Sequence, residues 1–250
     1  MNILFTIVLW LQLEIAVFGK STRIIGGEPV DINKHAYMAA LRNVMPDYHF
    51  CGATIISNKH MLTAGHCLYN KLENLNRIRV YTGSNSPSSY SGKAHKILQV
   101  HVHPAYNETK STNHDLAILT LKDPLIFGPT HKSVALPIEN IREGSFAVAL
   151  GWGLSQYPST TCSNVLRKTR LKIWNVSKCK EFFGSLQKQQ FCAFDKAGVG
   201  ICHGDSGGPL IINGRVIGIT SINFPCAKGY PDIFVNVFDY LGFIKHIIDK

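Results

Sequence analysis

The chain has 250 residues, 45% of them hydrophobic and 17% charged, and a formal net charge of +10. This composition is ordinary for a globular protein with a substantial core, and it contains no low-complexity tract. Lysine and arginine are scattered, and even their densest cluster, residues 167–172, alternates with other residues as on a half-exposed strand. We therefore interpret the charge as a solvated surface that attracts acidic partners, and we expect no nucleic-acid binding because no recognition motif is present.

Residues 1–19 open with an apolar run and end with small residues at Val17 and Gly19. This pattern is typical of a secretory signal peptide, although a basic first region is missing and Glu14 interrupts the apolar run. A membrane anchor is the alternative, but the run is short for a span and Glu14 would be costly within one. We expect a secreted, extracellular protein without a membrane segment.

Arg23 then precedes Ile24-Ile25-Gly26-Gly27. This stretch is either a linker into a strand or a processing site that creates a new amino terminus at Ile24. Such a terminus is a cation, which can be buried only where a carboxylate meets it.

Short apolar runs separated by turn residues fill the rest of the chain. The expected strands are residues 48–56, 77–81, 94–102, 116–121, 146–150, 165–174, 210–212, 216–222 and 233–237. Asn213-Gly214 between two such runs predicts a two-residue hairpin. The pattern favours antiparallel barrels or a sandwich, with a C-terminal helix that begins behind a cap at Asp239 and a weak boundary at residues 123–133.

Seven cysteines in a secreted chain predict disulfides rather than metal sites. Their number is odd, so at least one lacks a partner within the chain. The residues alone leave the connectivity open.

A glycine-rich stretch, residues 202–209, contains Ser206. A serine hydroxyl becomes a useful nucleophile only beside a base and near donors for an oxyanion. His66 lies between small residues and a cysteine, and Asp115 stands at the start of an apolar strand. Taken singly, each has an ordinary structural interpretation, namely a glycine-rich turn, one of eleven histidines and a strand-end carboxylate. Together they meet the chemical needs of a catalytic triad.

At this point the sequence resembles the chymotrypsin-like serine proteases. The resemblance covers residues 24–250 through IIGG at 24–27, TAGHC at 63–67, DLAIL at 115–119, GWG at 151–153 and GDSGGP at 204–209. It implies an all-β fold of two antiparallel six-stranded barrels with a C-terminal helix. The expected division is a signal peptide at 1–19, a propeptide at 20–23, and a peptidase domain at 24–250 whose barrels are residues 24–131 and 132–250.

The resemblance also implies roles. Ser206 would attack the peptide carbonyl, His66 would transfer the proton and Asp115 would orient His66, with Ser221 supporting the aspartate. The backbone N–H groups of Gly204 and Ser206 would form the oxyanion hole. Cleavage after Arg23 by a trypsin-like protease would let the ammonium of Ile24 pair with Asp205 and activate the zymogen.

The resemblance pairs six of the cysteines. The implied disulfides are Cys51–Cys67, Cys179–Cys192 and Cys202–Cys226, which leaves Cys162 in an expected surface loop. Cys162 is then a free thiol, and an intermolecular bridge is the alternative.

The specificity pocket departs from the best-known relatives. Its floor is Gly200, where a trypsin has aspartate, whereas Asp232 falls on a wall position that is usually glycine. This pair resembles collagenolytic proteases of crustaceans and some arthropod chymotrypsins, and predicts acceptance of large apolar and basic P1 side chains. Asp232 pointing away or paired internally is the alternative, and Asn223 at the entrance leaves an elastase-like preference open.

No cofactor is expected. Residues 82–96 lack the carboxylates that calcium needs, so no metal is expected either. Asn107 and Asn175 begin glycosylation triplets. The expected partners are polypeptide substrates, the activating protease and protein inhibitors, and a monomer is expected. A catalytically silent homologue that binds or regulates, and a trypsin-like processing protease, are the competing functions.

Overall fold

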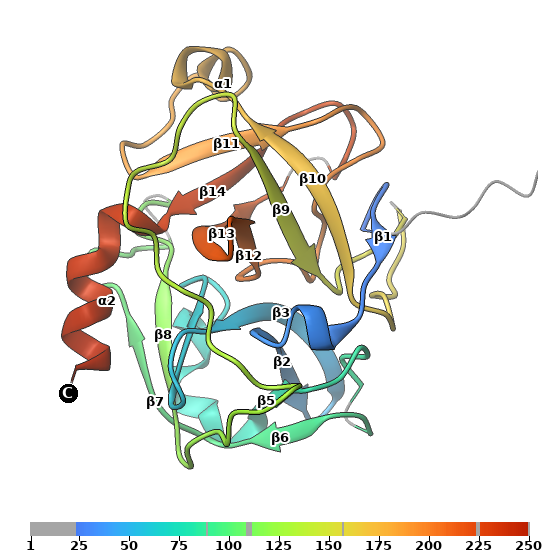
Figure 1. The fold of residues 1–250 in the computed structure, drawn as a ribbon, viewed down its shortest axis with the longest axis vertical. Coiled ribbons are helices and arrows are strands. Elements are labelled where there is room, and N and C mark those ends of the chain that lie inside the picture. Colours follow the sequence, from blue (N-terminus) through green and yellow to red (C-terminus); the bar gives the residue numbers. More distant parts are fainter. Residues whose placement is uncertain (1–23, 89, 109–111, 157, 224–225, 250) are drawn as a thin grey trace, which may run out of the picture.

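The structure is a computed structural model that describes residues 24–249 except 89, 109–111, 157 and 224–225 (Figure 1). The expected signal peptide and propeptide, including Arg23, lie outside the described residues.

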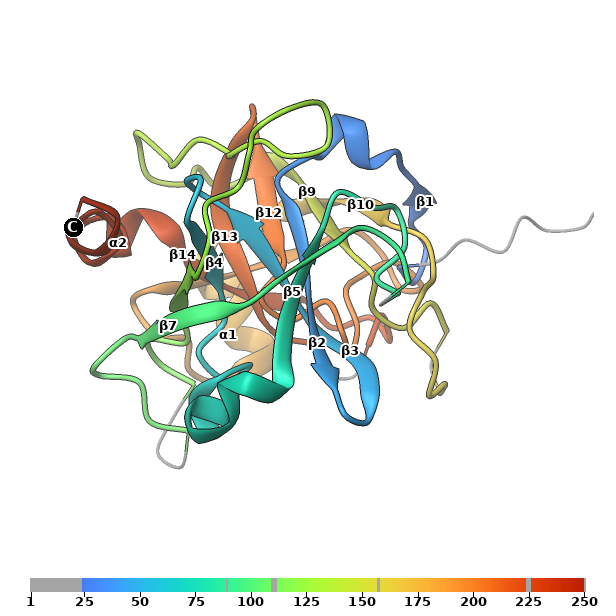
Figure 2. The ribbon, with the colours of Figure 1, turned by 90° about the horizontal axis from the view of Figure 1, so that it is seen from below.

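Within the described residues, one antiparallel sheet has seven strands in the order β6-β5-β2-β3-β4-β8-β7. The strands are β2 (Met38–Val44), β3 (Asp47–Ile55), β4 (His60–Thr63), β5 (Ile78–Thr82), β6 (Lys93–His95), β7 (Ile97–Val102) and β8 (Ala117–Leu121). The two edge strands β6 and β7 are consecutive in the chain, so the sheet curls into a partly open barrel (Figure 2). The prediction of one strand over residues 94–102 is wrong, because the pairing breaks at Lys96: β6 pairs with β5, whereas β7 pairs with β8.

The second described sheet contains β1 (Glu28–Pro29), β9 (Phe146–Gly151), β10 (Arg167–Ile173), β11 (Gln190–Phe194), β12 (Pro209–Ile212), β13 (Arg215–Ile222) and β14 (Asp232–Asn236). Because β9 pairs with both β12 and β10, the six strands β9 to β14 form a closed ring, and β1 adds to the edge of β10. The predicted fold of two antiparallel barrels is confirmed.

The hairpin between β12 and β13 is also confirmed. Asn213 and Gly214 both have positive φ values, 48° and 72°. A two-residue turn with this geometry matches the right-handed twist of the flanking strands, and asparagine and glycine are the residues that tolerate it.

The C-terminal helix is present, but its predicted cap is wrong. The 3₁₀ turn η3 (Val237–Tyr240) leads into α2 (Leu241–Ile248), and the side chain of Asn236 accepts the hydrogen bond from the Phe238 N–H at the start of η3. Asp239 instead lies inside η3 and accepts a hydrogen bond from Asn236. The turns η1 (Ile32–Lys34) and η2 (Tyr69–Arg77) complete the described 3₁₀ segments.

Helix α1 (Val176–Phe183) was not predicted. Val176, Cys179, Phe182 and Phe183 recur at helical spacing there, but the pattern spans only eight residues and buries only Cys179. The carboxamide of Asn175 caps this helix by accepting from the Lys178 N–H, so the glycosylation candidate also has a structural role.

The larger hydrophobic core joins the first barrel to the C-terminal helix. It contains strand residues such as Leu62 and Ile118 together with Ile244 and Ile247 of α2. In Figure 1, α2 accordingly lies beside β8. The C-terminal segment is therefore packed next to the strand that begins after Asp115.

Candidate active site

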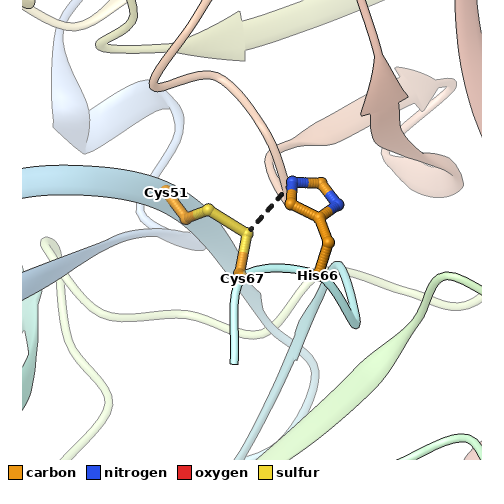
Figure 3. A group of neighbouring side chains, drawn as sticks. All are labelled: Cys51, His66 and Cys67. Atoms are coloured by element: carbon orange, nitrogen blue, oxygen red, sulfur yellow. Dashed lines mark hydrogen bonds between the residues drawn. A yellow bond between two sulfur atoms is a disulfide. The ribbon is translucent and has the colours of Figure 1, made fainter. Parts of the chain in front are cut away.

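His66 follows β4 in a tight turn. The disulfide between Cys51 on β3 and Cys67 anchors this turn to the first barrel (Figure 3). The His66 side chain is 30% exposed, so it faces solvent while its neighbours are buried. Its Nε2 atom lies 3.8 Å from Cys67 Sγ.

Asp115 precedes β8 and holds His66 through two hydrogen bonds. The residue is 1% exposed. Its Oδ1 atom accepts from the His66 backbone N–H at 2.8 Å, and Oδ2 pairs with the ring Nδ1 at 2.8 Å. The Ser221 hydroxyl donates to Oδ2 at 2.6 Å from β13 of the second barrel. Nδ1 is thus engaged with the carboxylate, and Nε2 is the ring nitrogen that faces away from Asp115.

Ser206 lies in the turn before β12 and is joined to the first barrel. Its carbonyl accepts a hydrogen bond from the Gly52 N–H on β3 at 2.8 Å, one residue from the disulfide that anchors His66. Gly207 has φ 76°, and a Cβ there would overlap the Thr63 hydroxyl, so the close approach requires glycine. The structure therefore brings the serine turn to the His66 side of the barrel interface. Within the part of the chain that the structure describes, no hydrogen bond joins the Ser206 hydroxyl to Nε2; such bonds are often long before substrate binds.

Two backbone N–H groups beside the serine are free. Within the described part of the chain, those of Gly204 and Ser206 have no protein acceptor, whereas those of Asp205, Gly207 and Gly208 all do. Gly204 has φ 94°, and a Cβ there would contact Cys162 Sγ at 2.8 Å and Gly153 Cα at 3.1 Å. The tight turn thus carries two nearby N–H groups without a protein acceptor, a feature that an oxyanion hole requires.

The GWG motif forms a cradle for Asp205, which sequence reasoning did not detect. Asp205 is fully buried and accepts hydrogen bonds from the N–H groups of Gly153 at 2.7 Å and Cys202 at 3.0 Å. A Cβ at either Gly151 or Gly153 would overlap its carboxylate. Burial raises the pKa of Asp205 to about 7 despite these two donors.

His49 is a second residue that sequence reasoning missed. Its Nε2 atom lies 2.9 Å from the Gly204 carbonyl, and it donates there because a carbonyl can only accept. Burial lowers the pKa of His49 to about 4, so the ring is neutral at physiological pH. No motif in the sequence marks this histidine, because the residue it holds is distant in the chain.

The two pocket candidates lie against each other. Asp232 is 3% exposed, and its Oδ2 atom lies 3.0 Å from the place where a Cβ of Gly200 would be. Oδ2 also accepts a hydrogen bond from the Ile201 N–H at 3.1 Å. Burial raises the pKa of Asp232 well above its ordinary value. The carboxylate thus points toward Gly200, and among the described residues it forms no ion pair.

Asn223 follows β13, and the antiparallel register that pairs Ile222 with Ile233 brings it beside Asp232. Asn223 is 8% exposed, and its Nδ2 has no hydrogen-bond partner among the described residues.

The expected disulfides are all present: Cys51–Cys67, Cys179–Cys192 and Cys202–Cys226. Cys162 is a free cysteine, and its half-buried side chain packs against the Cys202–Cys226 cluster. Burial raises the pKa of its thiol to about 11, which makes it a poor nucleophile. His66 and the first disulfide cluster closely enough to suggest a metal site, but oxidised sulfurs are not thiolate ligands.

These features define the class of protein to which the chain belongs. Two antiparallel barrels carry a solvent-facing histidine held by a buried aspartate and a serine turn with two N–H groups that have no described acceptor, and this is the architecture of a serine peptidase. A family model described as Trypsin matches residues 24–244. The chain belongs to the trypsin family.

Known relatives agree with this assignment. The chain is 34% identical over 223 residues to chymotrypsin-2 of Vespa crabro, covering 89% of this chain and 98% of that protein. It is 32% identical over 234 residues to trypsin 5G1 of Aedes aegypti, covering 91% and 85%. Neuropsin, a serine protease expressed in the limbic system of mouse brain, has a similar structure, with a TM-score of 0.81, 28% identity and coverage of 89% and 99%. One of the two sequence relatives is named a chymotrypsin and the other a trypsin, so their names do not decide the P1 preference of this chain.

No helix in the described ranges is both long and apolar enough to span a bilayer.

Proposed function

We propose that this chain is a secreted serine endopeptidase made as a zymogen, with His66, Asp115 and Ser206 as its catalytic residues. The observation that carries the proposal is the Asp115 carboxylate, which engages both the backbone and ring Nδ1 of His66 while Ser221 supports it. A buried carboxylate with this set of donors orients an imidazole and stabilises its protonated form.

The proposed reaction proceeds through an acyl-enzyme. Ser206 Oγ attacks the substrate carbonyl carbon as its proton moves to His66 Nε2, and the oxyanion is bound by the N–H groups of Gly204 and Ser206. The protonated ring then donates that proton to the leaving amine, and the C–N bond breaks. Water attacks the ester by the same route and regenerates Ser206. Each oxyanion donor contributes about 3 kcal/mol to the transition state.

Cleavage after Arg23 is the proposed activating step. Ile24 is fully buried, and Ile25 pairs with Gly200 of the expected pocket. Asp205 is a buried carboxyl group whose hydrogen-bond donors, among the described residues, are backbone N–H groups alone. An ammonium at Ile24 would supply the missing cation, ionise Asp205 and stabilise the ordered turn that carries the neighbouring oxyanion donors. A trypsin-like protease would perform the cleavage.

Specificity is proposed to depend on Asp232. Its carboxyl group lies against Gly200 without a cation, which supports a pocket that accepts apolar P1 side chains when Asp232 is protonated and basic ones when it is ionised. Asn223 narrows this pocket. Polypeptides are the proposed substrates and protein inhibitors further partners, with the enzyme acting as a monomer.

The test is kcat/KM on peptides that differ only at P1, with Phe, Leu, Ala or Arg, using protein cleaved after Arg23. Turnover of Phe or Leu that disappears in Ser206→Ala supports the peptidase. Arg turnover lost selectively in Asp232→Gly supports the pocket assignment. Folded, cleaved protein without turnover of any peptide contradicts the proposal and favours a catalytically silent homologue. Exclusive Arg turnover favours the trypsin-like processing protease.

A further inference from the structure

His114, the residue before Asp115, has an unusual backbone conformation. Its φ is 55°, in the left-handed region that costs a residue with a side chain about 1–2 kcal/mol. The Leu116 N–H donates to the His114 carbonyl at 2.7 Å, so the chain turns sharply around Asp115. Such a conformation persists only where surrounding contacts hold it.

Two contacts hold the His114 ring. It stacks on His103 with ring centroids 4.8 Å apart and an interplanar angle of 11°. Its Nδ1 atom lies 3.0 Å from the hydroxyl of Tyr240 in η3. Tyr240 is 4% exposed, so this hydrogen bond forms away from bulk water.

The C-terminal segment also holds His103. Tyr240 and Phe243 both meet the His103 ring edge-on, with centroids 5.2 Å and 4.9 Å away. Burial raises the pKa of Tyr240, so its hydroxyl keeps its proton, and burial lowers the pKa of His103. The charged groups that act on Tyr240 are the carboxylates of Asp115 and Asp239.

We propose that His114 is a positioning residue for Asp115, and that Tyr240 holds His114 in place. The inference rests on the proposed catalytic role of Asp115. The left-handed turn determines where the main chain delivers the Asp115 oxygens to His66 and Ser221. Without the Tyr240 contact, the turn relaxes and the carboxylate moves relative to the ring it orients.

The central test is Tyr240→Phe in the cleaved enzyme, which removes only the hydroxyl. We expect kcat to fall about 10-fold with KM unchanged, since small displacements of a catalytic group are costly. The acid limb of the pH profile of kcat/KM shifts to lower pH, because a displaced carboxylate stabilises the protonated His66 ring less.

The chain offers a matched control in Tyr37→Phe. The Tyr37 hydroxyl lies 2.9 Å from His35 Nδ1, with the rings edge-on at 5.8 Å, the same pairing outside the site. Both variants lose one hydrogen bond and a similar amount of thermal stability, but Tyr37→Phe keeps wild-type kcat and pH profile. A structural loss alone would move both enzymes equally.

Substitutions of His114 distinguish the contribution of its ring contacts from that of its backbone conformation. Glycine adopts φ 55° without strain, so His114→Gly keeps kcat if only the conformation matters. We expect it instead to lose activity like Tyr240→Phe, and the double variant to lose little more, because the two residues act together. Asparagine tolerates the left-handed region and keeps a polar side chain, so His114→Asn restores part of kcat.

Wild-type kcat and pH profile in both Tyr240→Phe and His114→Gly would overturn the inference. Asp115→Asn distinguishes this failure from that of the proposed function. An inactive Asp115→Asn beside fully active Tyr240 and His114 variants would refute only the positioning role. Full activity of Asp115→Asn would refute the catalytic role on which it rests.

Discussion

The two carboxylates that flank the serine turn have opposite surroundings. Asp115 accepts hydrogen bonds from the backbone and ring of His66 and from Ser221, so both of its carboxylate oxygens have hydrogen-bond donors. Asp205 is equally buried, but within the described ranges it receives only two backbone N–H donors, and burial raises its pKa to about 7. Under the proposed function, this difference means that Asp115 already orients the base His66, whereas Asp205 still needs a cation. The proposed activation would then change the surroundings of one carboxylate only.

The largest expected effect is at Asp115. Asp115→Asn keeps the shape of the side chain but no longer favours the tautomer that leaves Nε2 free to accept a proton. We expect kcat of the cleaved enzyme to fall about 10⁴-fold. Steady-state kinetics with a Phe or Leu P1 substrate would measure this, with circular dichroism as the control for folding. A loss below 10-fold would show that Asp115 does not act on His66.

Asp205→Asn should block activation while leaving the His66–Asp115 pair intact. Without a carboxylate, the ammonium of Ile24 has no anionic partner, and the turn that carries the oxyanion donors is not stabilised. Because the loss of one such donor costs about 10²–10³-fold, we expect cleavage to raise kcat/KM far less than in the wild type. Equal activation of variant and wild type would separate Asp205 from the switch.

The pH dependence of stability should reveal Asp205 in the uncleaved chain. Its folded pKa of about 7 lies above the unfolded value of about 4, so the folded state holds a proton that the unfolded state releases between these values. This contribution to stability is present below pH 4 and is lost as the pH rises through 7, by about 3–4 kcal/mol. Denaturant unfolding of wild type and Asp205→Asn at pH 4 and pH 8 would measure it. A constant difference between the two proteins would contradict the prediction.

His49 should make the free energy of unfolding depend on pH in the opposite direction, and its effect should be smaller. Its folded pKa of about 4 lies below the unfolded value of about 6.5, so its contribution is present at neutral pH and is lost as the pH falls through 4. In His49→Gln, we expect the decrease in the free energy of unfolding between neutral pH and pH 4 to be smaller by about 2–3 kcal/mol. The same unfolding series extended to pH 4 would show it, and an unchanged acid slope would be contrary to this expectation.

Sequence predicted the regions whose chemistry is local. The pair Asn213-Gly214 is enough to predict a two-residue hairpin turn. The strands at 146–150 and 216–222 are recognisable in the sequence as apolar runs. Family resemblance supplied the three disulfides and the residues around His66, because those motifs are short and contiguous.

The rest depends on contacts between distant segments. The Asp205 cradle needs Gly151 and Gly153 from another strand, and His49 reaches Gly204 across 155 positions. Neither periodicity nor motif carries such information. Helix α1 was missed because its apolar pattern covers only eight residues, about two helical turns. The cap was assigned to Asp239 instead of Asn236 because both are good capping residues three positions apart.

The most direct measurement is labelling by a fluorophosphonate, which reacts with an activated serine and needs no substrate specificity. Mass spectrometry of the protein before and after cleavage at Arg23 would locate and count the label. We expect one label on Ser206 after cleavage, little before it and none in His66→Ala. Equal labelling before cleavage would contradict the proposed switch, and folded, cleaved protein that stays unlabelled would contradict the peptidase itself.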